Sequence, residues 1–406
     1  MRRRPSLSRI RSPATRGSRC SGRTPPPHRY VQKGKVPPRG LESPPEGCPP
    51  CPGLEDGAPH PHGTEKIERC ASLDGDADRM VYHYWRAVGN GKPTGGEPVA
   101  HEWRLLDGDK IAALMTSFVN EQLTFLDLPP ISRLHIGVVQ TAYANGASTD
   151  WFRRNITCKI TTTKTGVKHV HAAAAAHVPL PLKDGCTRIG PAESNPPPLN
   201  MDISIYFEAN GHGSILFSDR AVLHFHAAKA QAQSEIDHVE PPKLPKGVES
   251  LCARNCPAGH RLNAANNLLA LRQLASQATG DGLCNFLIIE AILTRRGWTM
   301  SKFDGLYEDY PSRQTKLKVA DRNAIQCNDN ETETTQPPGL QPALNNLSEQ
   351  YEGGRCFVRP SGTEDVVRVY AEATTQYDAD QLALRAAQEV WQRAGGMGDK
   401  PTKITA

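Results

Sequence analysis

The spacing of apolar residues separates patterned from unpatterned stretches of the chain. Residues 1–62 are rich in Arg, Ser and Pro, and their few apolar residues follow no period, so we expect a disordered tail there. Patterned sequence begins near Glu65. The pattern is lost again near 172–200 and 233–262, where Pro is frequent, and we expect insertions in both stretches.

Between these stretches, predicted strands and helices alternate. Runs rich in Val, Ile and Tyr predict strands, and apolar residues spaced by three and four predict helices. The predicted strands are 79–85, 135–144, 156–163, 201–207, 317–321, 355–359 and 366–373. The predicted helices are 109–126, with Asp109 as N-cap, 263–277, 284–293, 341–351 and 379–394. This alternation predicts an α/β fold of mixed sheets with flanking helices.

Charge and hydropathy narrow the possible partners. The net charge of +5 arises in the first 40 residues, which hold twelve Arg and Lys and no acidic residue. The rest has 36 basic residues against 43 acidic ones, so a nucleic-acid-binding surface is not expected. Since no stretch approaches eighteen consecutive apolar residues, we expect no membrane span. The oligomeric state is not indicated by the sequence.

Cysteine usage points to a reducing compartment. The eleven cysteines follow no framework spacing, and the basic start is not followed by the apolar core of a secretory signal, so a cytoplasmic location is expected. The alternative is mitochondrial, if residues 1–40 are a transit peptide. Two cysteine groups could form halves of a zinc site, although they lie in the least patterned stretches: Cys48 with Cys51, and Cys252 with Cys256 and His260.

An aspartate-rich loop is the first candidate site. Asp74, Asp76 and Asp78 alternate with small residues beside a predicted strand, a spacing that can place three carboxylates on one hard cation such as Mg²⁺ or Ca²⁺. An EF-hand would need Gly and Glu where Arg79 and Trp85 stand. Arg79 next to the carboxylates favours a phosphate near the ion. A solvated acidic turn is the alternative.

A second polar loop joins two predicted strands near the C-terminus and consists of Arg359, Pro360, Ser361, Gly362 and Thr363. Gly362 would let backbone N–H groups approach an anion, and two hydroxyls add donors. Arg359, together with Arg368 on the next strand, can grip a phosphate. The alternative is a polar hairpin turn in which Arg368 pairs with Glu364 or Asp365.

Two further loops offer polar groups suited to a sugar phosphate. One ends a predicted strand and consists of Glu208, Ala209, Asn210, Gly211, His212 and Gly213. Its Glu and Asn side chains suit sugar hydroxyls, and its glycines allow close contact. The other contains Lys168 and His169 after Gly166. Solvated loop residues are the alternative for both.

These loops, in this order, resemble the α-D-phosphohexomutase family. The resemblance implies that Asp74, Asp76 and Asp78 bind Mg²⁺ and that Arg79 stabilises the transferring phosphoryl group. It implies that the sugar is read by Glu208, Ala209, Asn210 and His212, and that the non-reacting phosphate is held by Arg359, Pro360, Ser361, Gly362, Thr363 and Arg368. Lys168 and His169 would line the cleft as acid, base or phosphate contacts.

Three stretches, residues 136–146, 164–169 and 357–373, resemble one branch of this family. That branch interconverts N-acetylglucosamine 6-phosphate and N-acetylglucosamine 1-phosphate in the biosynthesis of UDP-N-acetylglucosamine. The implied domains are 63–100, the end of a metal-binding second domain; 101–299, a sugar-binding third domain; and 300–398, a phosphate-binding α+β fourth domain followed by a 399–406 tail.

The family's first domain is expected to be missing. In the family that domain carries a phosphoserine in a Thr-Ala-Ser-His-Asn-Pro loop, and this chain contains no Ser-His dipeptide. We therefore expect no mutase turnover from this chain alone. The alternative function is a catalytically inactive protein that binds sugar phosphates.

Overall fold

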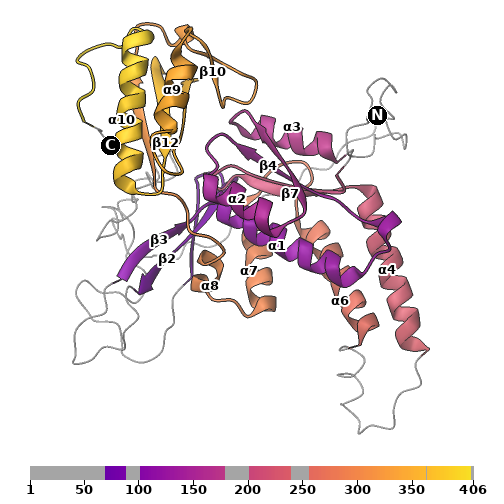
Figure 1. Ribbon diagram of the computed structural model, residues 1–406. Helices are drawn as coiled ribbons and strands as arrows, with labels where there is room; N and C mark the ends of the chain where they lie inside the picture. Colours follow the sequence, from indigo (N-terminus) through magenta and orange to yellow (C-terminus); the bar gives the residue numbers. More distant parts are fainter. Residues whose placement is uncertain (1–68, 88–100, 179–200, 239–255, 363, 404–406) are drawn as a thin grey trace, which may run out of the picture.

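The computed structural model describes residues 69–87, 101–178, 201–238, 256–362 and 364–403. The predicted tail, residues 1–62, and Thr363 lie outside these ranges. Helices flank mixed sheets in the larger part of the molecule, and a smaller unit near the C-terminus carries α9 and α10 (Figure 1). The predicted fold class is thereby confirmed. Within the described ranges, every helix is too short or too polar to cross a lipid bilayer.

The first sheet is antiparallel, with strands β1 (Cys70–Leu73), β2 (Met80–Ala87) and β3 (His101–Leu106) in that order. Met80, Tyr82 and Tyr84 are buried at every second position of β2, as expected of a strand with one face on a core. They share one hydrophobic cluster with helices of the predicted third domain. The predicted domain boundary near residue 100 therefore falls between two paired strands, β2 and β3.

The second sheet forms the centre of the larger part, in the order β5 (Cys158–Thr163), β4 (Ile136–Thr141), β6 (Ile203–Phe207), β7 (Gly213–Phe217). β4 runs parallel to β5 and β6, and β7 is antiparallel to β6. All residues of β4 and β6 are buried, which agrees with their high content of apolar residues. The sheet thus has helices on both faces, with α3 (Val167–His177) on one and α1 (Gly108–Leu126) on the other (Figure 1).

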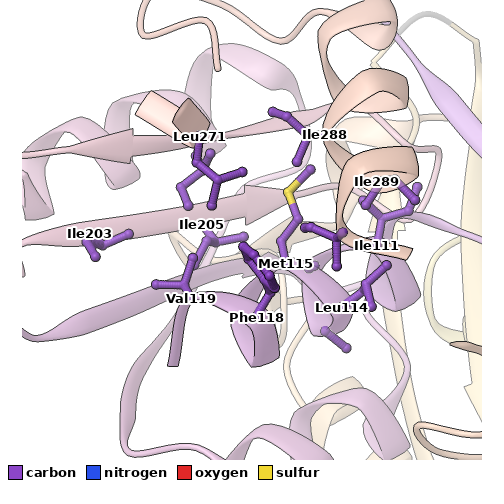
Figure 2. Packing of buried hydrophobic residues seen from close by; sticks show 14 of the residues in the cluster. Ile111, Leu114, Met115, Phe118, Val119, Ile203, Ile205, Leu271, Ile288 and Ile289 are labelled. Carbon is purple, nitrogen blue, oxygen red and sulfur yellow. The ribbon is translucent and has the colours of Figure 1, made fainter. Parts of the chain in front are cut away.

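The main core lies between this sheet and helices α1, α6 (Pro257–Leu274) and α7 (Gly282–Arg296). Figure 2 shows side chains of α1, including Ile111, Met115 and Phe118, meeting Ile205 of β6 and Ile288 of α7. The outer elements of this part are α2 (Gly146–Asn155), α4 (Asp219–Asp237), α8 (Met300–Asp304) and the short 3-10 helix η1 (Pro130–Ser132).

Helix α1 begins earlier than predicted. Asp107, not Asp109, is the N-cap, and its side chain accepts hydrogen bonds from the N–H groups of Asp109 (3.0 Å) and Lys110 (3.3 Å). Asp109 is buried instead and accepts a hydrogen bond from Asn145 N at 2.9 Å. Burial raises the pKa of the Asp109 carboxyl well above its usual range. Asp107 and Asp109 are equally suitable N-caps as residue types, so only the packing of the first helical turn determines which of them is the cap.

The two predicted insertions are shorter than the sequence indicated. Residues 172–177, which include the run of alanines, belong to α3, because Ala has the highest helix propensity. Helix α4 continues to Asp237, and α6 begins at Pro257, a residue tolerated in a first helical turn. The remainders of the predicted insertions, 179–200 and 239–255, lie outside the described residues.

Several other boundaries and elements were predicted incorrectly or missed. The strand predicted at 135–144 ends at Thr141 in a turn, and the one predicted at 317–321 is β8 (Ser312–Lys318). The missed elements include β1, β3, β7, α2, α3, α4 and α8, which are short, mixed in polarity or without clear period.

The C-terminal unit is an antiparallel sheet in the order β11 (Arg355–Pro360), β12 (Val366–Glu372), β8, with α9 (Leu340–Ser348) and α10 (Gln376–Arg393) packed against it. A short ribbon of β9 (Gln326–Cys327) and β10 (Thr334–Gln336) follows the 3-10 helix η2 (Arg322–Ala324). Alternate residues of β11 and β12 contact the helices, so the remaining side chains line the opposite face of the sheet.

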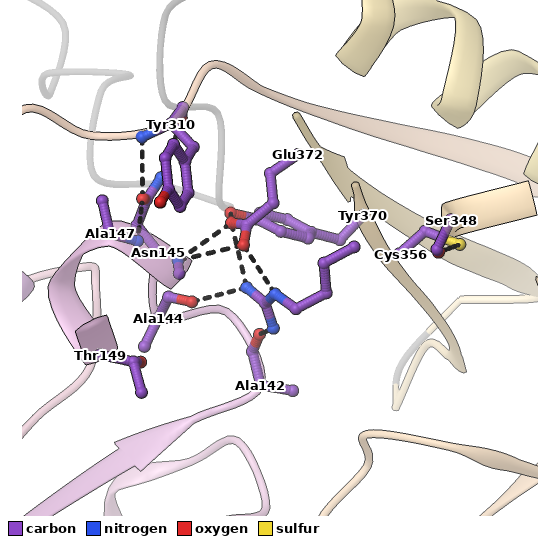
Figure 3. Close-up of polar contacts among 12 residues, drawn as sticks. Ala142, Ala144, Asn145, Ala147, Thr149, Tyr310, Ser348, Cys356, Tyr370 and Glu372 are labelled. Atoms are coloured by element: carbon purple, nitrogen blue, oxygen red, sulfur yellow. Dashed lines mark hydrogen bonds and ion pairs between the residues drawn. The ribbon is translucent and has the colours of Figure 1, made fainter. Parts of the chain in front are cut away.

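That opposite face contacts the larger part through a polar latch, formed by Arg355, Glu372 and residues 142–146. Arg355 donates to the carbonyl oxygens of Ala142 (2.9 Å) and Ala144 (2.7 Å) and is paired with Glu372 at 2.7 Å. Glu372 accepts from Gly146 N at 3.1 Å. Figure 3 shows these contacts beside Asn145, whose side chain bonds the backbone of Tyr310. The latch fixes how the C-terminal unit meets the end of β4.

Candidate functional site

The aspartate loop lies between β1 and β2 and brings its three carboxylates together. Oxygens of Asp74, Asp76 and Asp78 lie within 4.8 Å of one another. The turn is closed by a hydrogen bond from Ala77 N to Asp74 O (3.2 Å), with Ala77 in a left-handed conformation (φ 57°). Among the described residues, this is the one group of acidic, His or Cys side chains spaced closely enough to hold a metal ion.

The donor set of this loop fits a hard cation. All three ligand candidates are carboxylates, Asp76 is exposed, and Asp78 Oδ1 is buried without a hydrogen bond from any described residue. Arg79 balances the negative charge, since its Nε lies 3.6 Å from Asp74 and 3.5 Å from Asp78. The loop can therefore hold one divalent cation and present a guanidinium next to it.

The sugar loop, residues 208–213, packs directly on the aspartate loop. Arg79 and His212 form an isolated antiparallel bridge, and Met80 N donates to Gly211 O at 3.3 Å. His212 is 2% exposed, and its Nδ1 lies 3.2 Å from Asp78 Oδ2. Its ring also packs against Gly280, where a Cβ would collide with it. His212 thus joins the two loops.

The other sugar-loop residues differ in what they can offer a ligand. Glu208 is buried, and its Oε1 accepts a hydrogen bond from Gly166 N at 2.8 Å. Asn210 is exposed, and its Oδ1 accepts from His212 N at 3.0 Å, which leaves the amide NH₂ as a donor. Ala209 O accepts from Gly108 N, where a Cβ would collide with the loop backbone.

Lys168 and His169 lie in the first turn of α3, beside Gly166 (φ +120°). Lys168 is exposed and His169 half-buried. The structure places both near the loop that contacts Glu208, but it assigns neither a chemical role. Their function stays a prediction.

The phosphate loop connects β11 and β12. Arg359 and Arg368 are directly opposite in the strand register, so both guanidiniums leave the sheet on the face away from α10. Burial raises the pKa of the Tyr143 hydroxyl, whereas the charges of Arg359 and Arg368 act to lower it. Arg359 Cζ lies 5.8 Å from the ring centroid. Arg359 thereby lies against one half-buried aromatic side chain.

The turn of this loop differs in detail from the prediction. Ser361 N closes the hairpin by donating to Val366 O (2.9 Å), so this amide is not free for an anion. Gly362 has open space where a Cβ would lie, so contacts with the described residues do not require glycine there. Pro360 is half-buried at the end of β11, and Thr363 lies outside the described residues.

The ion pairs that the structure gives the acids of this loop are with other cations than Arg368. Glu364 pairs instead with Lys316 at 3.3 Å, and Asp365 lies 3.8 Å from Arg322 Nε. Lys316 is directly opposite Arg368 on β8. The sequence alone did not place this lysine next to Arg368; the register of the three strands does.

Sequence reasoning also missed the contact that brings the phosphate loop to the sugar loop. Glu331, in the turn between β9 and β10, lies 3.3 Å from Arg359 Nε and accepts a hydrogen bond from Thr165 N at 3.2 Å. The next amide, Gly166 N, is bound by Glu208. The aspartate loop therefore contacts the sugar loop directly, and the phosphate loop is linked to the sugar loop through Glu331 and residues 165–166.

Of the residues of the zinc alternative, only Cys256 and His260 lie within the described part of the chain. Cys256 caps α6 by accepting from Gly259 N (3.3 Å), and His260 stacks on Phe125 with ring centroids 5.7 Å apart. Cys48, Cys51 and Cys252 lie outside the described residues.

Comparison with known proteins identifies related domains in both parts of the chain. Residues 107–178 and 185–298 match the family model "Phosphoacetylglucosamine mutase AMG1, domain III", and residues 316–389 match "Phosphoglucomutase/phosphomannomutase, C-terminal domain". The chain is 41% identical to the pig phosphoacetylglucosamine mutase over 84% of its length, and 42% identical to the Arabidopsis thaliana enzyme over 79%. It spans about half the length of the curated relatives it matches (51% and 48% of these two).

Solved structures give the same relationship. The Aspergillus fumigatus N-acetylphosphoglucosamine mutase, crystallised with GlcNAc-6P and magnesium, superimposes with a TM-score of 0.60 at 37% identity, covering 82% of this chain and 51% of that one. An N-acetylglucosamine-phosphate mutase in its substrate complex gives a TM-score of 0.59 at 30% identity, covering 81% and 50%. The chain therefore belongs to the phosphoacetylglucosamine mutase branch of the α-D-phosphohexomutase family.

Proposed function

We propose that the three loops form one site for N-acetylglucosamine phosphates beside Mg²⁺, within a mutase that interconverts the 6-phosphate and the 1-phosphate. The observation that carries this proposal is the linkage of the loops: His212 pairs with Asp78, and Glu331 connects Arg359 to Thr165, next to the amide that Glu208 binds. The related Aspergillus fumigatus mutase was crystallised with GlcNAc-6P and magnesium, which supports the choice of ligand and ion.

The metal would be held by Asp74, Asp76 and Asp78, whose clustered oxygens suit Mg²⁺. A magnesium ion bound there supplies positive charge that offsets the charge of a transferring phosphoryl group. Arg79, held beside the same carboxylates, would add a second positive charge on the side of the loop that meets His212.

The sugar phosphate would be held at both ends. Arg359, Ser361 and Arg368 would bind the phosphate that does not react, while Glu208 and Asn210 would bind sugar hydroxyls. Ala209, Pro360, Gly362 and Thr363 would contribute backbone or side-chain contacts from the same loops. Because a mutase must act on either end of its substrate, a fixed grip on one phosphate and a polar grip on the ring would serve both orientations.

Lys168 and His169 are proposed to line the same cleft. They follow Gly166, whose amide is bound to Glu208, so both lie next to the sugar loop. Their side chains suit proton transfer or a phosphate contact, and the structure favours neither.

The test is a calorimetric titration of the chain with N-acetylglucosamine 6-phosphate in the presence of Mg²⁺. We expect binding by the unaltered chain, and Arg368→Ala should weaken it by about 1.5–3 kcal/mol, the value of a charge-assisted hydrogen bond. The matched control is Arg393→Ala, which removes a cation paired with Glu389 on α10 of the same unit, and its affinity should not change. Absence of binding by the unaltered chain, or equal losses in both variants, would contradict the proposal.

A further inference from the structure

Glu331 occupies an unusual place between the two parts of the molecule. It lies in the turn between β9 and β10, outside the loops that sequence reasoning assigned to the ligand. Its backbone has φ 58°, a left-handed conformation that a glutamate adopts rarely. The turn is held by Asn328, whose carbonyl oxygen accepts from Glu331 N (3.1 Å) and whose Oδ1 accepts from Thr332 N (3.0 Å). The turn therefore fixes the backbone from which the Glu331 side chain extends.

One carboxylate oxygen of Glu331 serves two partners. Oε2 accepts a hydrogen bond from Thr165 N at 3.2 Å and lies 3.3 Å from Arg359 Nε. The side chains of Arg359 and Glu331 are 15% and 20% exposed, so this ion pair is well shielded from water. Shielding strengthens the attraction compared with an ion pair on the surface.

The position of this carboxylate determines which face of Arg359 remains available. Glu331 occupies the Nε side of the guanidinium, and the Tyr143 ring lies 5.8 Å from its Cζ. A guanidinium has five N–H donors, so the terminal nitrogens remain for a phosphate. An arginine held on one side loses less rotational freedom when it binds an anion.

We propose that Glu331 is a positioning residue for the phosphate grip, the pair Arg359 and Arg368 proposed to bind the phosphate that does not react. It holds Arg359 by charge, as an ion pair on the Nε side without a hydrogen bond there, and also accepts from the Thr165 amide, next to the Gly166 amide that Glu208 binds. The distance between the phosphate grip and the sugar loop is thereby set before the ligand arrives. This inference rests on the proposed function of the site.

If Glu331 repelled the ligand instead of positioning Arg359, removing its charge would strengthen binding. A carboxylate near a bound phosphate also repels it, so a Glu331 that merely stands in for the ligand's phosphate would weaken binding. Glu331→Gln separates the two roles: glutamine retains an acceptor for Thr165 N but loses the charge that holds Arg359. Glu333→Gln is the matched control, because it removes the same charge from an exposed position in the same turn.

The experiment is a calorimetric titration with N-acetylglucosamine 6-phosphate in the presence of Mg²⁺. We expect Glu331→Gln to weaken binding by about tenfold and Glu333→Gln to change it less than about twofold. In an Arg359→Ala background the further effect of Glu331→Gln should vanish, because Glu331 acts through that arginine. If Glu331 only stabilised the local structure, Glu331→Gln would weaken binding in that background as well.

The outcomes are distinguishable. If the unaltered chain does not bind, the proposed function fails and this inference fails with it. If the unaltered chain binds and Glu331→Gln binds equally well or more tightly, the positioning role alone is overturned. An undiminished effect of Glu331→Gln in the Arg359→Ala background would also overturn it.

Discussion

Replacing Gly211 with alanine should destabilise the chain and separate the sugar loop from the aspartate loop. Gly211 has φ +88°, and an added Cβ would collide with the carbonyl oxygen of Met80. Strain in the left-handed region and steric overlap add, so we expect a loss of about 2–5 kcal/mol in the free energy of unfolding. Urea denaturation followed by circular dichroism measures it.

Gly297 provides the control, since it shares the left-handed conformation but has open space. Its φ is +59°, and nothing lies within 4 Å of a Cβ placed there. Gly297→Ala should cost about 1–2 kcal/mol, the conformational strain alone. If both variants lose the same free energy of unfolding, the close approach of Gly211 to Met80 contributes nothing, contrary to the structure.

Replacing Asp76 with alanine should abolish magnesium binding to the chain. Asp76 is the exposed member of the carboxylate cluster, so its removal takes away one of three oxygen ligands with little effect on packing. Because a water molecule can replace the lost oxygen ligand but not its negative charge, binding should fall below detection. Calorimetric titration with MgCl₂ measures the loss.

The control for the metal is Asp399→Asn, which removes an exposed carboxylate near the C-terminus. Its magnesium binding should equal that of the unaltered chain. Retention of binding by Asp76→Ala would show that the cluster is an acidic turn without a resident ion, the alternative that the sequence left open.

The sequence revealed the loops because each carries its chemistry in a short stretch. Three carboxylates at alternate positions, and a polar loop followed by an arginine on the next strand, are visible without a fold. The buried strands β4 and β6 were visible for the same local reason, as short stretches rich in Val, Ile, Tyr and Phe. Such patterns do not show which loops lie close together in the folded chain.

The contacts that join the loops could not be predicted, because they depend on tertiary structure. In the sequence, His212 cannot be distinguished from other polar loop residues. Only the fold places it against Asp78 and Gly280. Glu331 is 28 residues before Arg359 in the numbering and carries no motif. The latch residues Arg355 and Glu372 read as ordinary charged positions on strands, yet they face Ala142 and Gly146.

The central claim is that the aspartate, sugar and phosphate loops form one site for an N-acetylglucosamine phosphate. Amide chemical-shift mapping of the isotope-labelled chain, titrated with N-acetylglucosamine 6-phosphate and Mg²⁺, tests it most directly. We predict shifts in residues 208–213 and 359–368 that saturate at the same ligand concentration, and shifts in residues 74–79 that require Mg²⁺. Shifts confined to one loop, or clustered elsewhere in the molecule, would contradict it.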